Sequence, residues 1–302
     1  MLTAIDGITV GHWTNLDART GCTVVVLPPG TVASGEVRGG APATREFALL
    51  EPTRTVSTVD AVVLSGGSAF GLAAGHGVMT WLEEQGRGFE TRYGAIPIVV
   101  GMSLYDLGVG DASVRPGEAE GRAAAEAASA GPVALGMVGA GTGATVSKWS
   151  GPEAVVDAGI GGATLRAGAL VVSALVAVNA VGAIDDGTTT DDPGPPHRRT
   201  DDEAAPADGA AAPGGDDRSN TTIGVVATNA ALDKVACHLL AQSAHDGLAR
   251  SVFPAHTSSD GDAFVACATG AVSVDAAAGD VAHLRVLAQQ AVATAVRSLA
   301  PA

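Results

Sequence analysis

The sequence has few aromatic residues, few cysteines and little positive charge, and each shortage excludes a class of protein. Aromatics make up 3% of the residues against 46% hydrophobic, so the core must consist of small aliphatic side chains, with 41 glycines allowing close backbone contact. Three scattered cysteines without a CxxC pair exclude zinc and redox motifs and suit a reducing compartment. Acidic residues outnumber basic ones, 32 to 17, which argues against nucleic-acid or anionic-membrane binding.

No hydrophobic run is long enough for a membrane span. The longest, near residues 167–183, is interrupted by Ser173, Asn179 and Gly182. The first seven residues lack the charged and apolar regions of a secretion signal. We therefore expect a soluble, cytoplasmic protein.

A glycine-dense stretch, residues 138–149, superficially resembles a phosphate-binding loop. Neither the Walker spacing nor G-x-G-x-x-G is met, so we expect no nucleotide and no other cofactor. Lys148 is the one charged residue in this stretch, which makes it a candidate for chemistry.

Short apolar runs and helical patterns share the chain, which favours layered sheets and helices. A serine at a strand–turn–helix junction, Ser68, is expected to cap its helix. Residues 185–219 carry no apolar pattern and are expected to form a disordered acidic linker. Strands are predicted over residues 23–27, 61–64, 96–100, 154–160, 167–178, 222–228 and 263–268. The strands over 154–160 and 167–178 are expected to pair through a turn at Gly161 and Gly162. Helices are predicted from the Ser68 turn to Leu82 and over 117–130, 232–248 and 281–299.

Thr221 stands between this polar segment and an apolar β-type run. A threonine hydroxyl needs a base within reach to become a nucleophile. Cleavage of the Asn220–Thr221 bond would give Thr221 an α-amine whose pKa of roughly 7.7–8.0 leaves much of it unprotonated near pH 7.5. The hypothesis is that the chain cuts itself there and then uses Thr221 as its nucleophile. Alternatively, Asn220 is a turn residue before a buried strand, or part of a glycosylation sequon.

Other polar residues sit next to predicted strands. Asn179 at a strand end could donate to an oxyanion or simply terminate the strand. Asp260 and Asp262 could orient an N-terminal amine, form a turn, or act as calcium-like ligands, although no complete EF-hand loop is present. His238 and His245 share a helix face without a partner that would complete a metal site, which predicts surface or interface histidines.

Several stretches occur together in one order: Arg38-Gly39-Gly40 with Thr44-Arg45-Glu46, residues 64–72, residues 220–223, and Asp260-Gly261-Asp262. With them the chain resembles the P1 peptidase family, also called peptidase family S58, over nearly its whole length. That family includes L-aminopeptidase/D-esterases, β-peptidyl aminopeptidases and nylon-oligomer hydrolases.

The resemblance implies an α+β fold, a four-layer αββα sandwich formed by residues 1–302 as one domain. It implies self-cleavage into chains 1–220 and 221–302, a small peptide or amide substrate, and assembly into tetramers or larger homo-oligomers. By the same resemblance Thr221 is the nucleophile with its amine as base, Asn179 is an oxyanion donor, and Tyr105 is a substrate or oxyanion contact.

Lys148, Asp260 and Asp262 match the nylon-oligomer hydrolase branch. The aminopeptidase branch has Ser and Glu in place of the two aspartates, which puts dipeptide or β-peptide specificity in question. Two alternatives stay open: an N-acyltransferase of the ornithine acetyltransferase type, which cuts before a threonine in a different context, and a non-catalytic assembly protein.

Overall fold

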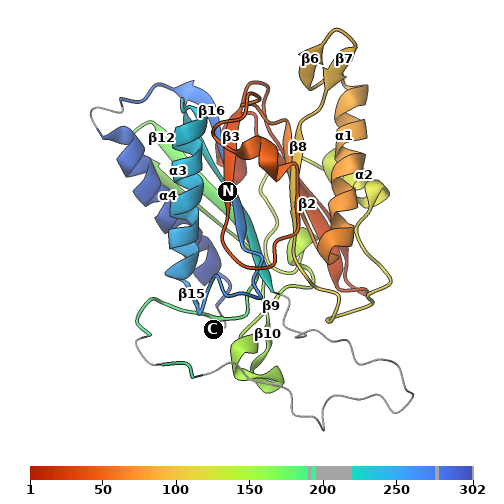
Figure 1. Cartoon of the computed structure of the whole chain (residues 1–302), viewed down its shortest axis with the longest axis vertical. Helices are drawn as coiled ribbons and strands as arrows, with labels where there is room; N and C mark the ends of the chain where they lie inside the picture. The colour runs from red at the N-terminus through yellow and green to blue at the C-terminus, as the bar shows by residue number, and fades with distance from the viewer. Residues whose placement is uncertain (190–191, 195–219, 276–278, 301–302) are drawn as a thin grey trace.

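Two five-stranded sheets lie face to face, and two helices cover the outer face of each (Figure 1). The computed structural model describes residues 1–189, 192–194, 220–275 and 279–300. The arrangement confirms the expected α+β, four-layer αββα sandwich. Most of the expected linker, residues 190–191 and 195–219, lies outside the described residues.

The first sheet has the strand order β1-β2-β5-β8-β4, and α1 and α2 pack on it. Its parallel pair is β5 and β8, so their carboxyl ends lie at the same edge. The bounds are β1 Thr9–Asn15, β2 Thr20–Val26, β4 Thr44–Arg45, β5 Ala61–Ser65, β8 Val99–Ser103, α1 Ala74–Glu84 and α2 Glu118–Glu126.

The second sheet has the order β11-β12-β14-β16-β3, with α3 and α4 on its outer face. Strand β14 is central, antiparallel to β12 and parallel to β16. The bounds are β3 Val32–Val37, β11 Gly159–Ala167, β12 Leu170–Asn179, β14 Thr221–Ala230, β16 Ala263–Val272, α3 Lys234–Ala249 and α4 Asp280–Arg297.

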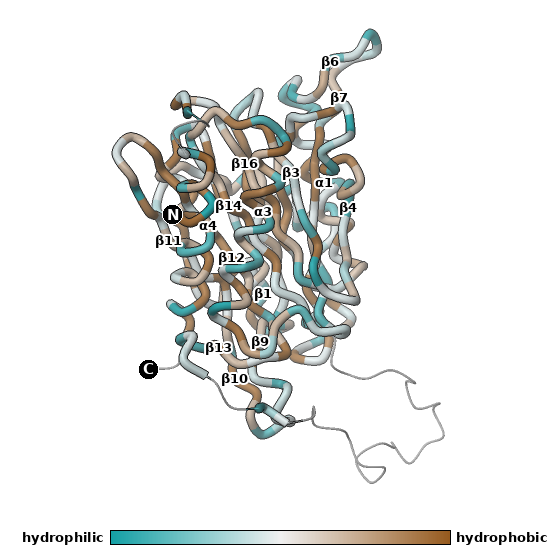
Figure 2. The backbone as a smooth tube through the Cα atoms, turned by 60° about the vertical axis from the view of Figure 1, so that its left-hand side comes forward, coloured by the Kyte–Doolittle hydropathy of each residue, from teal (hydrophilic) through white to brown (hydrophobic). Residues whose placement is uncertain are grey.

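Among the described residues, three strand pairs and six 3-10 turns lie outside these layers, and hairpin β6–β7 projects from the body (Figure 2). The pairs are β6 Phe89–Thr91 with β7 Gly94–Ile96, β9 Thr145–Val146 with β10 Val156–Asp157, and β13 Ala183–Ile184 with β15 Val252–Phe253. The turns are η1 Leu2–Ala4, η2 Phe47–Leu50, η3 Ser68–Ala73, η4 Gly139–Gly141, η5 Lys148–Ser150 and η6 Pro152–Ala154. In the described ranges, no helix is both long enough and apolar enough to span a bilayer.

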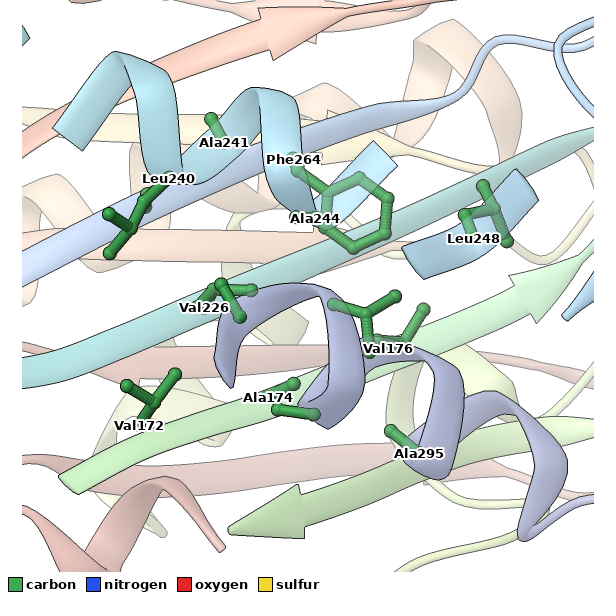
Figure 3. Close-up of a cluster of buried hydrophobic side chains, with 14 of the residues drawn as sticks. Val172, Ala174, Val176, Val226, Leu240, Ala241, Ala244, Leu248, Phe264 and Ala295 are labelled. Carbon is green, nitrogen blue, oxygen red and sulfur yellow. The ribbon is translucent and has the colours of Figure 1, made fainter. Parts of the chain in front are cut away.

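The core has three apolar layers: one between the sheets and one under each helix pair. Under α3 and α4, small residues such as Ala241, Ala244 and Ala295 let the helices lie close to Val176 and Val226 of the sheet (Figure 3). Because the sheets are covered on both faces, strands such as β14 are almost continuously buried. This explains their unbroken apolar sequence.

Three local predictions were wrong. In place of the strand predicted over 154–160, the chain forms the end of η6, the short strand β10 and the start of β11. The hairpin turn lies at Gly168, with φ of 59°, rather than at Gly161 and Gly162, which are inside β11. Gly161 serves packing instead, since a Cβ there would lie 2.0 Å from the carbonyl oxygen of Ala295 in α4. Ser68 makes no capping hydrogen bond; Gly67 precedes the 3-10 turn in a left-handed conformation.

Gly161→Ala should therefore destabilise the fold by roughly 1–3 kcal/mol, because β11 and α4 would have to separate. Gly101→Ala is the matched control: Gly101 is also a buried strand glycine, but its nearest neighbours to an added Cβ lie at 3.6 Å. Urea denaturation of both variants measures the difference. Equal losses would contradict the close approach of α4.

Candidate active site

The register of three strands brings the predicted site residues to one edge of the second sheet. Ile223 of β14 pairs with Ala263 of the parallel strand β16, so the residues before each strand also run side by side. A bridge between Asn220 and Asp260 continues that alignment. The antiparallel strand β12 ends at Asn179, directly opposite Thr221.

The Asn220–Thr221 peptide is buried, with its two residues 1% and 4% exposed. The amide of Gly261 donates a hydrogen bond to the carbonyl oxygen of Asn220 at 2.8 Å. The Thr221 hydroxyl also donates to that oxygen. Gly261 has to be glycine, because a Cβ there would lie 2.7 Å from Thr221 Oγ1 and 2.5 Å from the Ala41 carbonyl oxygen.

The two aspartates are 1% exposed and hydrogen-bonded to protein groups. Asp260 accepts from the amide and hydroxyl of Thr257 at 2.9 and 2.7 Å. Asp262 accepts from the Thr222 amide at 2.7 Å and faces His256 Nδ1 at 2.8 Å. In the continuous chain, therefore, Asp262 contacts the residue after Thr221. Among the described residues no group of three or more His, Cys, Asp or Glu is arranged to hold a metal ion.

Lys148 and Asn179 are in direct contact, and Asn179 lies opposite Thr221 in the β12–β14 pair. Lys148 Nζ donates to Asn179 Oδ1 at 2.8 Å, and the Thr145 amide donates to the same oxygen at 3.0 Å. Asn179 Nδ2 donates to the backbone carbonyl of Tyr105 at 2.8 Å. Since an amide N–H must donate and a carbonyl must accept, these partners fix the orientation of the Asn179 amide. Tyr105 thus reaches the site through its backbone.

Burial sets the protonation of this cluster. It lowers the pKa of Lys148 to about 7, against a smaller opposing effect of the Asp260 charge. Burial also raises the pKa of Asp260, helped by the neighbouring charge of Asp262 and opposed by the Thr257 hydrogen bonds. A lysine with such a pKa can take up a proton near neutral pH, as a base must.

The Arg38-Gly39-Gly40 stretch follows β3 and covers the two aspartates. The Arg38 amide donates to the Asp262 carbonyl at 2.8 Å, and the Ala41 amide to the Asp260 carbonyl at 2.9 Å. A Cβ on Gly39 would lie 2.4 Å from the Asp260 carbonyl oxygen. These glycines are therefore explained by close backbone packing against the site.

Two residues next to the site had no predicted role, and one was assigned wrongly. The sequence patterns assign no function to His256 and include Gly261 only as part of a motif. His245 is fully buried rather than on the surface, and its ring packs against His256 with centroids 5.0 Å apart. The six-residue separation between His256 and Asp262 was the available signal, but it indicates contact only once the loop conformation is known.

The sandwich fold and this strand-edge cluster define an α+β protein with a buried polar site at one edge of its second sheet. Residues 1–302 match the sequence profile described as Peptidase family S58, and the chain belongs to that family. It is 45% identical over 299 residues to an uncharacterized aminopeptidase of Mycobacterium leprae (strain TN), covering 92% of this chain and 80% of that one. It is 30% identical over 281 residues to a 6-aminohexanoate-oligomer endohydrolase of Kocuria sp. (strain KY2), covering 90% of this chain and 76% of that one.

Solved structures share the fold. A beta-aminopeptidase of a Burkholderia species superposes with a TM-score of 0.71 at 24% identity, covering 98% of this chain and 84% of that one. An L-aminopeptidase D-Ala-esterase/amidase of Ochrobactrum anthropi, described as a variant of the Ntn hydrolase fold, gives 0.72 at 20% identity with the same coverage. The family match and the two named relatives identify a hydrolase that acts on amide bonds, and they favour it over the acyltransferase and assembly-protein alternatives.

The buried Lys148 predicts a pH-dependent stability. Its pKa is about 7 in the folded protein against 10.5 for an ordinary lysine, so between these values the unfolded chain binds more protons. The free energy of unfolding should then rise with pH in this window. In a Thr221→Ala background, Lys148→Met should remove a rise of several kcal/mol between pH 7 and 10. Urea denaturation across this range is the measurement; equal slopes would contradict the shift.

Proposed function

We propose that this chain is a self-processing N-terminal-threonine hydrolase that cuts its own Asn220–Thr221 bond and then hydrolyses short amide substrates through an acyl-enzyme. The observation that carries the proposal is the environment of one carbonyl group. The Asn220 carbonyl accepts from the Gly261 amide at 2.8 Å and lies beside the Thr221 hydroxyl. The Thr221 hydroxyl, as nucleophile, and the Gly261 amide, as oxyanion donor, thus both lie at the bond to be cut.

Self-cleavage is proposed to begin with an N→O acyl shift. Thr221 Oγ adds to the Asn220 carbonyl carbon while its proton passes to Lys148, whose pKa of about 7 leaves it partly neutral. The Gly261 amide stabilises the resulting oxyanion. The C–N bond then breaks, the Thr221 nitrogen takes the proton from Lys148, and an ester remains. Water hydrolyses that ester, releasing the Asn220 carboxylate, the Thr221 hydroxyl and the new α-amine.

In the mature enzyme the α-amine of Thr221 acts as base for its own hydroxyl. The substrate carbonyl takes the position that the Asn220 carbonyl vacates, so the same Gly261 amide is available to it. Asn179 keeps one Nδ2 hydrogen beyond its bond to Tyr105, which can serve as a second oxyanion donor. Asp260 and Asp262 orient the backbone around the nucleophile, and Tyr105 contacts the substrate.

The preferred substrate is proposed to be a short linear amide of the 6-aminohexanoate-oligomer kind. The paired aspartates, Asp260 and Asp262, support this over an aminopeptidase substrate, although a 45%-identical relative is named as an aminopeptidase. Hydrolysis of 6-aminohexanoate oligomers, compared with aminoacyl and β-aminoacyl anilides, measures the preference.

We further propose a cytoplasmic homo-oligomer of four or more chains. The three free, buried cysteines suit a reducing compartment. The projecting hairpin β6–β7 exposes Phe89, Tyr93 and Ile96 at 47%, 84% and 48%, which supports contact with another chain. Light scattering coupled to size-exclusion chromatography measures the assembly.

The intact mass of the purified protein tests the cut directly. Wild type should give two chains, residues 1–220 and 221–302. Thr221→Ala should give one uncut, inactive chain of 29.6 kDa, because it lacks the attacking oxygen. Thr221→Ser keeps that oxygen and should still be cut. A cut and active Thr221→Ala protein would refute the assignment.

Asn179→Ala should lower kcat by roughly 10²-fold or more if its amide stabilises the oxyanion. KM should change much less, because the interaction forms mainly in the transition state. Steady-state kinetics on an amide substrate with fully cut protein measures both. An unchanged kcat would exclude the oxyanion role.

A further inference from the structure

His256 lies outside the residues assigned above, in the loop between β15 and β16, and is bound to Asp262 twice. Its ring Nδ1 lies 2.8 Å from Asp262 Oδ2, and its backbone amide donates to the same oxygen at 3.2 Å. Its backbone is left-handed, with φ of 57°. That conformation is uncommon for a residue other than glycine, and such positions are often held in place at functional sites.

The second ring nitrogen of His256 also faces an acceptor. Nε2 lies 3.4 Å from the backbone carbonyl of His245, so each ring nitrogen faces an acceptor: Nδ1 faces the Asp262 carboxylate and Nε2 faces the carbonyl. A neutral imidazole carries one proton and can satisfy one of them, whereas an imidazolium donates to both. The geometry therefore selects the protonated ring, paired with Asp262.

The surroundings of His256 are consistent with a single positive charge on this ring. Burial alone would lower its pKa, but the hydrogen bond and charge of Asp262 and the His245 carbonyl outweigh it, and the pKa is raised. Arg38 opposes this from the segment after β3, and it is itself paired with Glu36 and Asp246 at 2.9 and 3.1 Å.

The neighbouring His245, on α3, is neutral. Burial lowers the pKa of His245 to about 3. Its Nε2 lies 2.9 Å from the Glu36 carbonyl, to which only an N–H can donate.

We propose that His256 is a positioning residue for the nucleophile, which rests on the function proposed above. Its imidazolium holds Asp262 Oδ2, which leaves Oδ1 to hold the Thr222 amide at 2.7 Å. Regular pairing of β14 with β16 starts one residue later, at Ile223. The Asp262 bond therefore holds the Thr222 amide on the β16 side, while β12 pairs with Thr221 and Thr222 on the other side.

This arrangement gives the reaction an alkaline limit. The contribution of His256 is present while the ring is protonated and is lost as pH rises through its raised pKa. The base needs the opposite, since it acts only when deprotonated. The pH dependence of kcat should be bell-shaped, with His256 responsible for the alkaline side.

Two measurements test the proposal, and the first needs no activity. In uncut Thr221→Ala protein, NMR should show the His256 ring titrating above 6.5, the ordinary value for histidine, and the Thr222 amide signal moving with the same midpoint. Asp262→Asn should lower that midpoint. His238→Gln is the matched control and should leave that midpoint unchanged, because this half-buried histidine contacts the Gly35 carbonyl and Gln242 instead. A Thr222 amide chemical shift that does not change as His256 titrates would overturn the proposal.

The second measurement is the pH profile of amide hydrolysis. His256→Asn, which tolerates the left-handed backbone, and His256→Gln should lower kcat by roughly 10- to 100-fold through misplacement of the nucleophile. In both variants the fall of kcat at alkaline pH should disappear, and KM should stay unchanged. A wild-type profile in a folded His256→Gln protein would refute the positioning role. An uncut, inactive wild type would refute the proposed function instead, while the NMR coupling would still stand.

Discussion

The parallel pairing of β14 with β16 is the constraint on which the rest of the site depends. It starts both strands at the same edge of the sheet and therefore aligns Asn220–Thr221 with Asp260-Gly261. The Gly261 amide then meets the Asn220 carbonyl as a continuation of the strand alignment. The carbonyl of this buried peptide bond thereby receives a backbone hydrogen bond that strand alignment alone supplies.

Burial makes this edge chemically useful. Lys148 and Asp260 are both shifted toward their neutral forms because charges are costly away from water. Asp262 is instead paired with His256. The site thus combines a lysine that is partly neutral near pH 7 with an Asp262–His256 pair whose carboxylate also accepts from the Thr222 amide. Most of these groups lie in segments that enter or leave β12, β14 and β16, so the rigid sheet positions them.

Glycine has a structural task throughout this arrangement. Gly261 leaves room for the Thr221 hydroxyl, and Gly39 lets the segment after β3 lie against Asp260. Gly161 lets helix α4 lie close to strand β11 on the outer face of the second sheet. A protein with so few aromatics obtains its packing from such close backbone contacts, and part of that packing shapes the site itself.

From the sequence alone, the apolar runs predicted six strands of the two sheets, β2, β5, β8, β12, β14 and β16, and the four helices, but missed β1, β3 and β4. The ordered motifs predicted the family and its fold. Thr221, Asn179, Lys148 and the two aspartates could be nominated because each stands at the end of an apolar run or alone in an uncharged one. The β11–β12 turn and the places of His245 and His256 could not be predicted. They depend on which helix lies against which strand, and on one left-handed loop residue, so only the tertiary structure decided them. Residue type and periodicity specify local structure, whereas contacts between distant segments arise only when the layers pack.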